Sequence, residues 1–127
     1  MKKIILPIMI ACLMFSCGND AQIKDDAKRL VELQCKAKES FDKIMAINNQ
    51  LQERVGSSMN DPVAMQKVLE DQKKYLDEIK VLQGEESKLV EEFKVLEGEM
   101  KTKYNSEKDK EKMRIELAAQ LAQSGCK

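Results

Sequence analysis

Apolar residues recur at alternating steps of three and four over residues 62–104, and this spacing predicts one long helix with a single stripe to bury. Asp61 and Pro62 suit its start, since an N-cap oxygen followed by a proline is a common helix opening. Gly84 and Gly98 fall on outward positions, so we expect them to leave the helix continuous. The stripe comprises Met65, Val68, Gln72, Tyr75, Ile79, Leu82, Glu86, Leu89, Phe93, Leu96 and Met100.

A stripe with the same spacing precedes it and predicts a helix over about residues 22–55. The turn formers at 56–60 separate the two, and helices joined by so short a link pack as an antiparallel hairpin. This first stripe comprises Ile23, Ala27, Leu30, Gln34, Ala37, Phe41, Ile44, Asn48, Leu51 and Val55. Folding the chain about residue 58 predicts these layers: Leu51 with Met65, Ile44 with Gln72, and Phe41 with Tyr75.

A third, shorter helix is predicted over about residues 107–123, after the turn signal Asn105-Ser106 and before Gly125, a candidate C-cap. Met113, Leu117 and Leu121 give it one apolar face, which should pack back along the second helix. The predicted fold is therefore all-α: an elongated antiparallel coiled-coil hairpin of two long helices (about 22–55 and 62–104) with a shorter third helix packing back on it.

Polar residues interrupt both stripes at Gln34, Asn48, Gln72 and Glu86. The predicted layers bring them near each other, and paired polar groups would fix the register at some cost in stability. A ligand-binding role for Gln34 and Glu86 is the alternative. Other apolar residues lie off the stripes and would meet the third helix or a second copy, so a homodimer is an open expectation. They are Met45, Ile47, Leu69, Leu76, Val81, Val90 and Val95.

The composition favours elongated helices over a compact enzyme, because 35% of the 127 residues are charged and only 4% are aromatic. The 22 basic and 22 acidic residues give no clustered basic excess for nucleic acid. Histidine is absent, so the usual catalytic triads and zinc sites lack their base or ligand. The nearest approach to a metal cluster is Glu85, Glu86, Glu91 and Glu92, which we interpret as a solvated helix face. We expect no enzyme activity, no cofactor and no metal.

The first twenty residues have the pattern of a targeting segment. Lys2 and Lys3 precede an apolar run from Ile4 to Phe15, which is too short for a comfortable membrane span, and Ser16 then precedes Cys17. Residues 1–20 resemble a bacterial lipoprotein precursor, although Met14 and Phe15 depart from the commonest motif before the cysteine. An ordinary secretory signal, an uncleaved anchor and cleavage before Cys12 remain as alternatives.

The resemblance implies removal of a signal peptide, residues 1–16, and acylation of Cys17, for instance with palmitate. A lipidated tether at 17–22 would then carry the helical coiled-coil domain at 23–127. The protein would face the cell envelope, anchored to the membrane through Cys17. Gly18 is not the acidic residue of the simplest inner-membrane retention signal, which favours the outer membrane.

Two further cysteines, Cys35 and Cys126, form an even pair that is interpreted first as a disulfide in an exported protein. The predicted packing brings both to the same height. Closing a loop of about 90 residues would contribute on the order of 4 kcal/mol in the chain-entropy model. A reversible redox pair and two free thiols are the alternatives.

Lysines surround the expected turn after the second helix, which lies toward the lipid anchor in the predicted packing. Lys101, Lys103, Tyr104 and Lys108 are candidates for contact with lipid headgroups or a partner, and a frayed polar hairpin is the alternative. The sequence thus predicts a membrane-anchored cell-envelope lipoprotein with a non-catalytic structural or protein-binding role, whose protein partner it does not identify. The alternative function is a periplasmic chaperone-like client-binding module, which needs an exposed apolar groove.

Overall fold

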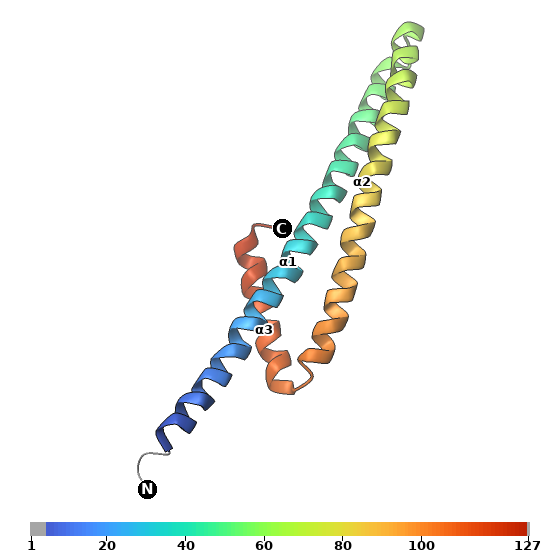
Figure 1. The fold of residues 1–127 in the computed structure, drawn as a ribbon. Coiled ribbons are helices and arrows are strands. Elements are labelled where there is room, and N and C mark those ends of the chain that lie inside the picture. The colour runs from blue at the N-terminus through green and yellow to red at the C-terminus, as the bar shows by residue number, and fades with distance from the viewer. Residues whose placement is uncertain (1–4, 127) are drawn as a thin grey trace. The chain divides into compact units, whose positions relative to one another are not determined.

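Three helices account for the described part of the chain. The computed structural model describes the backbone of residues 5–126 and the side chains of residues 19–126. Helix α1 spans Ile5–Ser58, α2 spans Pro62–Lys103 and α3 spans Glu107–Ser124. The fold is all-α, as the sequence predicted, with two long helices and a shorter third helix that packs on the first (Figure 1).

The helix ends are set by the capping residues that the sequence indicated. Asp61 Oδ1 accepts hydrogen bonds from the backbone N–H groups of Val63, at 3.0 Å, and Ala64, at 3.2 Å, so it caps α2 ahead of Pro62. Ser106 Oγ accepts from the N–H of Asp109 at 3.1 Å and caps α3. Gly125 closes α3 with a φ of 67°, a left-handed conformation that glycine adopts without strain. Helix α2 runs through Gly84 and Gly98 without a break.

Helix α1 begins earlier than the expected start near residue 22. Its backbone is helical from Ile5 onward, through the segment 17–22 that was expected to be a lipidated tether ahead of the first helix. The apolar run contains mostly good helix formers, and Pro7 falls in the first helical turn, where its missing N–H is not required. The side chains of residues 1–18, including Cys12 and Cys17, lie outside the described residues.

The chain divides into two compact units, which we describe separately. The three-helix unit comprises residues 1–32 and 94–127, and the two-helix unit comprises residues 33–93. In the three-helix unit, the first part of α1, the last part of α2 and all of α3 share one core. Its buried apolar side chains are Ile23, Ala27, Leu30, Val31, Leu96, Met100, Tyr104 and Met113.

The two-helix unit has a different register from the predicted one. Ile44, Ile47 and Ile79 form its buried cluster, with Tyr75 and Leu82 packed against them. Ile44 therefore clusters with Ile79 rather than with Gln72, so the residues that face it lie further along α2 than predicted. An ion pair between Arg54 and Asp71 at 2.6 Å shows a shift in the same direction.

Helix α1 of this unit is also turned about its axis relative to the prediction. Ile47, 9% exposed, is buried in place of its neighbour Asn48, which is exposed. Gln34 is exposed too, and Phe41 remains 49% exposed. The prediction of Gln34, Asn48 and Phe41 as buried stripe members is therefore wrong. The observed packing buries an isoleucine and leaves two amides in water, which avoids their desolvation cost.

The stripe of α2 is confirmed at every position. Each of its eleven predicted members is buried or half-buried, including the polar pair Gln72 and Glu86. The predicted face of α3 holds only in part. Met113 is buried and Leu117 is half-buried, but Leu121 is 40% exposed, so the last turns of α3 contribute little to the core.

Candidate functional site

The most closely connected polar group lies where α2 ends, inside the three-helix unit. Tyr104, only 4% exposed, donates a hydrogen bond from its hydroxyl to Oδ2 of Asp26 at 2.6 Å. Lys103 Nζ pairs with the same oxygen at 2.7 Å. We call these three residues the Asp26 cluster. It ties the N-terminal part of α1 to the end of α2.

The charges of the Asp26 cluster support one another. Burial raises the pKa of Asp26. The hydrogen bonds from Lys103 and Tyr104 lower it by a larger amount in total, together with the nearby positive charges, so the pKa lies below the ordinary value of 3.8. The hydrogen bond to Asp26 raises the pKa of Lys103, and burial together with that carboxylate raises the pKa of Tyr104. Near neutral pH the cluster therefore holds a carboxylate, an ammonium and a neutral phenol, which is a stable structural arrangement.

The candidate contact residues at this end of α2 divide into two pairs. Lys103 and Tyr104 belong to the Asp26 cluster, where both bond to the carboxylate of Asp26. Lys101 and Lys108 are exposed, and Lys101 pairs with Glu97 at 3.1 Å. Lys103 keeps 40% of its side chain exposed, whereas Tyr104 is buried, so the pair outside the Asp26 cluster is the more open one. Asp20 of α1 pairs with Lys112 of α3 in the same unit.

A groove of about 240 Å³ lies beside the Asp26 cluster, within the three-helix unit. Its floor is apolar, formed by Leu30, Met100, Met113 and Leu117. The cations at its rim already have acidic partners: Lys110 pairs with Glu107 and Arg114 with Glu111, at 2.8 and 2.7 Å. The groove is thus shallow and apolar, and the positive charges of Lys110 and Arg114 at its edge are balanced by neighbouring carboxylates.

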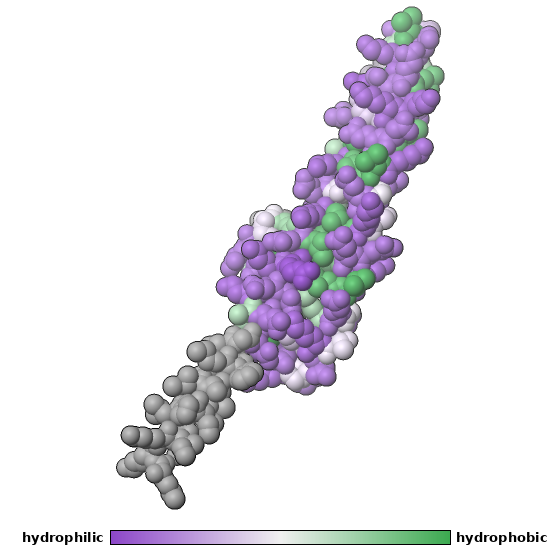
Figure 2. Space-filling view, viewed as in Figure 1, coloured by the Kyte–Doolittle hydropathy of each residue, from purple (hydrophilic) through white to green (hydrophobic). Residues whose placement is uncertain are grey.

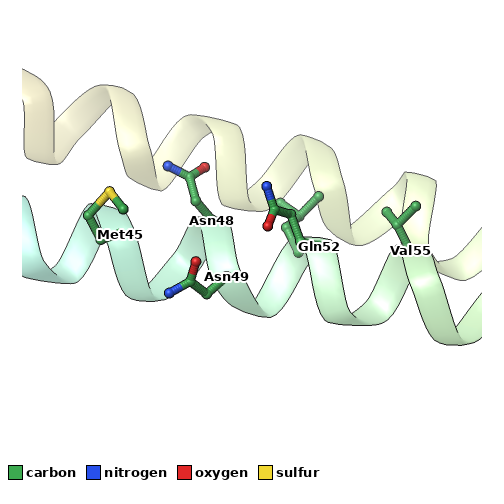
Figure 3. A pocket seen from close by; sticks show the side chains of 6 residues that line it. Met45, Asn48, Asn49, Gln52 and Val55 are labelled. Carbon is green, nitrogen blue, oxygen red and sulfur yellow. The ribbon is translucent and has the colours of Figure 1, made fainter.

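A second hollow, of about 460 Å³, lies on α1 in the two-helix unit. Met45, Asn48, Asn49, Gln52 and Val55 follow one another along this stretch of α1, and α2 runs alongside (Figure 3). Asn48, which the sequence assigned to register, thus lines an open surface together with Asn49 and Gln52. Sequence reasoning missed this surface because it placed Asn48 between the helices.

The two cysteines of the described part of the chain are both half-buried. Cys35 lies on α1 in the two-helix unit, and Cys126 follows Gly125 at the end of α3 in the three-helix unit. No disulfide is present among the described residues, so the predicted Cys35–Cys126 bond stays a prediction.

The described residues contain no group of three or more acidic, cysteine or histidine side chains placed to hold a metal ion. Glu86 is half-buried, while Glu85, Glu91 and Glu92 are exposed. Among residues 19–126, whose side chains the structure describes, none of the helices combines the length and apolar character needed to cross a bilayer.

Comparison of the chain with protein-family models, with curated proteins and with solved structures finds no match.

Proposed function

We propose that this chain is a lipid-anchored protein of the cell envelope that acts by contact, as a structural element or by binding another protein. The pattern of residues 1–20 carries the proposal: a basic start, a short apolar run, and Ser16 before Cys17. Under this proposal residues 1–16 are removed, Cys17 is acylated, and the outer membrane holds the anchor.

The helical part supports a contact role because its apolar stripes pack against each other and most of its outward positions carry polar or charged side chains. In α2 the stripe is engaged along its whole length, and the outward positions carry alternating lysines and carboxylates. Such a surface suits a spacer or a docking element. Lys101 and Lys108 are the candidate residues for contact with lipid headgroups, since both side chains are exposed.

Metabolic labelling with an alkyne analogue of palmitate in a bacterial host tests the anchor. The wild-type chain should incorporate the label, the Cys17→Ala variant should lose it, and the matched Cys12→Ala variant should keep it. Mass spectrometry of the N-terminal peptide should find residue 17 as the first residue. Label that depends on Cys12, or no label in the wild-type chain, would contradict the proposal.

We also propose that Cys35 and Cys126 join in a disulfide once the chain is exported. Both thiols are half-buried, and an even pair is typical of proteins in oxidising compartments. Peptide mapping of unreduced protein from the host envelope should recover the two peptides linked. If each thiol instead reacts with an alkylating reagent before reduction, the disulfide is absent.

A further inference from the structure

The two-helix unit leaves one of its sides apolar. Phe41 and Met45 on α1 are 49% and 44% exposed, and Leu69 and Leu76 on α2 are 59% and 47% exposed. We call these four residues the open flank. Figure 2 shows hydrophobic side chains at the surface of the two-helix part, among mostly hydrophilic ones.

Heptad geometry places the four residues on a common side of the hairpin. Leu69 and Leu76 are seven residues apart and follow the α2 stripe by one position, while Phe41 and Met45 occupy the edge of α1 that its rotation turned outward. In an antiparallel pair, corresponding edges of the two helices lie on the same side. Arg54 and Asp71 occupy the other edge of each helix, so their ion pair marks the opposite side.

We propose that a second copy of this chain covers the open flank, so that two hairpins pack face to face as a four-helix assembly. Apolar residues spaced seven apart on one helix pack well against apolar residues with the same spacing on another helix. In a dimer with a two-fold axis, both copies use the same surface, so the flank of one copy would pack on the flank of the other. A single layer of two helices also buries its core poorly. The buried isoleucines of this unit, Ile44, Ile47 and Ile79, keep 7%, 9% and 8% of their surface exposed, and a second layer would supply further cover.

The area of the flank suits a pair of copies. The edge of α2 continues from Leu69 and Leu76 through Gln83 to Val90, which is 37% exposed. At about 1.5 Å per residue this stretch is roughly 32 Å long, and two helices side by side are roughly 20 Å wide. The contact would bury roughly 600 Å² per copy, or about 1,200 Å² in total, at the lower limit of specific protein interfaces.

The charged residues beside the flank are compensated within each copy. Asp42 pairs with Lys38 at 2.9 Å on α1, and Lys80 lies 4.0 Å from Asp77 on α2. A two-fold axis parallel to the helices would place α1 of each copy opposite α2 of the other. The apolar side chains of the flank, rather than these charges, would then carry the contact.

This inference rests on the contact role proposed above and names the partner as the chain itself. It is tested by sedimentation equilibrium of the full chain, purified as the bacterial host delivers it, in density-matched detergent. The wild-type protein should fit a dimer. Burying one leucine contributes roughly a factor of ten to a hundred to association, so the Leu69→Gln/Leu76→Gln variant should dimerise at least 100-fold more weakly.

Val63→Gln/Val81→Gln is the matched control. Both valines are exposed on α2, at 80% and 62%, and both lie away from the flank. This variant should dimerise like the wild type, and circular dichroism should show all three proteins equally helical. A monomeric wild type, or a Leu69→Gln/Leu76→Gln variant that dimerises normally, would overturn the proposal.

A photo-crosslinking amino acid at position 76 identifies the occupant of the flank in intact cells. The proposal expects a product of twice the mass of the chain. Products joined to many other proteins would instead indicate client binding of the chaperone type and would overturn it. Labelling at Cys17 fails or succeeds independently of these results, because residue 17 is far in sequence from the flank, so the anchor and the dimer are tested separately.

Discussion

Tyr104 and Asp26, 78 residues apart in the sequence, are joined by a 2.6 Å hydrogen bond from the phenol to the carboxylate. The bond lies in the core of the three-helix unit and connects α1 to the residue that follows α2. Lys103 pairs with the same carboxylate oxygen, so two donors share this one acceptor.

Removing the phenol should destabilise the protein. Tyr104→Phe leaves the ring in place but takes one donor from a largely buried carboxylate, at an expected cost of about 1–2 kcal/mol in the free energy of unfolding. Urea denaturation measures the change. Tyr75→Phe is the matched control, since the half-buried Tyr75 ring faces Arg54 at 5.7 Å through its π surface and would keep that contact. Equal effects of the two substitutions would show that the phenol of Tyr104 contributes nothing special.

The depressed pKa of Asp26 predicts an acid-sensitive contribution to stability. Because its folded-state pKa lies below the unfolded value, the contribution is complete above the unfolded pKa of about 3.9 and is lost as pH falls through the folded pKa. Asp26→Asn should therefore be less stable than the wild type at pH 6–7, and the gap should narrow below about pH 4. Unfolding midpoints measured from pH 7 to pH 2 provide the test.

The control for this pH series is Asp77→Asn. The Asp77 side chain is 69% exposed and lies 4.0 Å from Lys80, so its replacement should change stability little at any pH. A constant gap between Asp26→Asn and the wild type over the whole range would mean that the charge of Asp26 is not what stabilises the cluster.

The observed orientation of α1 predicts opposite outcomes at two adjacent positions. Ile47→Ala removes a buried side chain and should cost about 2–3 kcal/mol, whereas Asn48→Ala, at an exposed position, should change stability by less than about 0.5 kcal/mol. Thermal and urea unfolding of the two variants measure this difference. A larger loss at residue 48 than at residue 47 would favour the orientation expected from sequence.

The ion pair between Arg54 and Asp71 should contribute modestly. Their side chains are 50% and 37% exposed, so a double-mutant cycle with alanine should give a coupling of roughly 0.5 kcal/mol that shrinks in 1 M salt. The longer, more exposed pair of Asp77 and Lys80 serves as the reference cycle and should show less coupling. A coupling that does not respond to salt would indicate a packing effect of Arg54 on Tyr75 in place of a charge effect.

Local patterns made much of this fold predictable. Periodicity identified the whole α2 stripe, and Asp61, Ser106 and Gly125 marked helix ends, because capping depends on only a few neighbouring residues. The pairing of the helices was harder. Slipping a heptad hairpin by seven residues still sets an apolar stripe against another, so small differences decide between registers. Burial of Ile47 in place of Asn48 and the Arg54–Asp71 pair are such differences.

The Asp26 cluster was missed for a related reason. Tyr104 continues the α2 stripe one turn beyond Met100, and a buried tyrosine hydroxyl usually finds a hydrogen-bond partner. The position of Tyr104 on the stripe therefore indicated, from sequence alone, that its hydroxyl needs a hydrogen-bond acceptor on a facing helix. The position of the acceptor depended on the register, which the sequence left open.

The turn between α1 and α2 has a practical use. A hydrogen bond from the Asp61 N–H to the Ser58 carbonyl, at 3.1 Å, closes the turn, while Met59 at its tip is 72% exposed. Lengthening a surface loop costs little entropy, so an epitope inserted after Met59 should leave the helices intact. Antibody access to that epitope in whole and permeabilised cells would then reveal on which side of the envelope the tip resides.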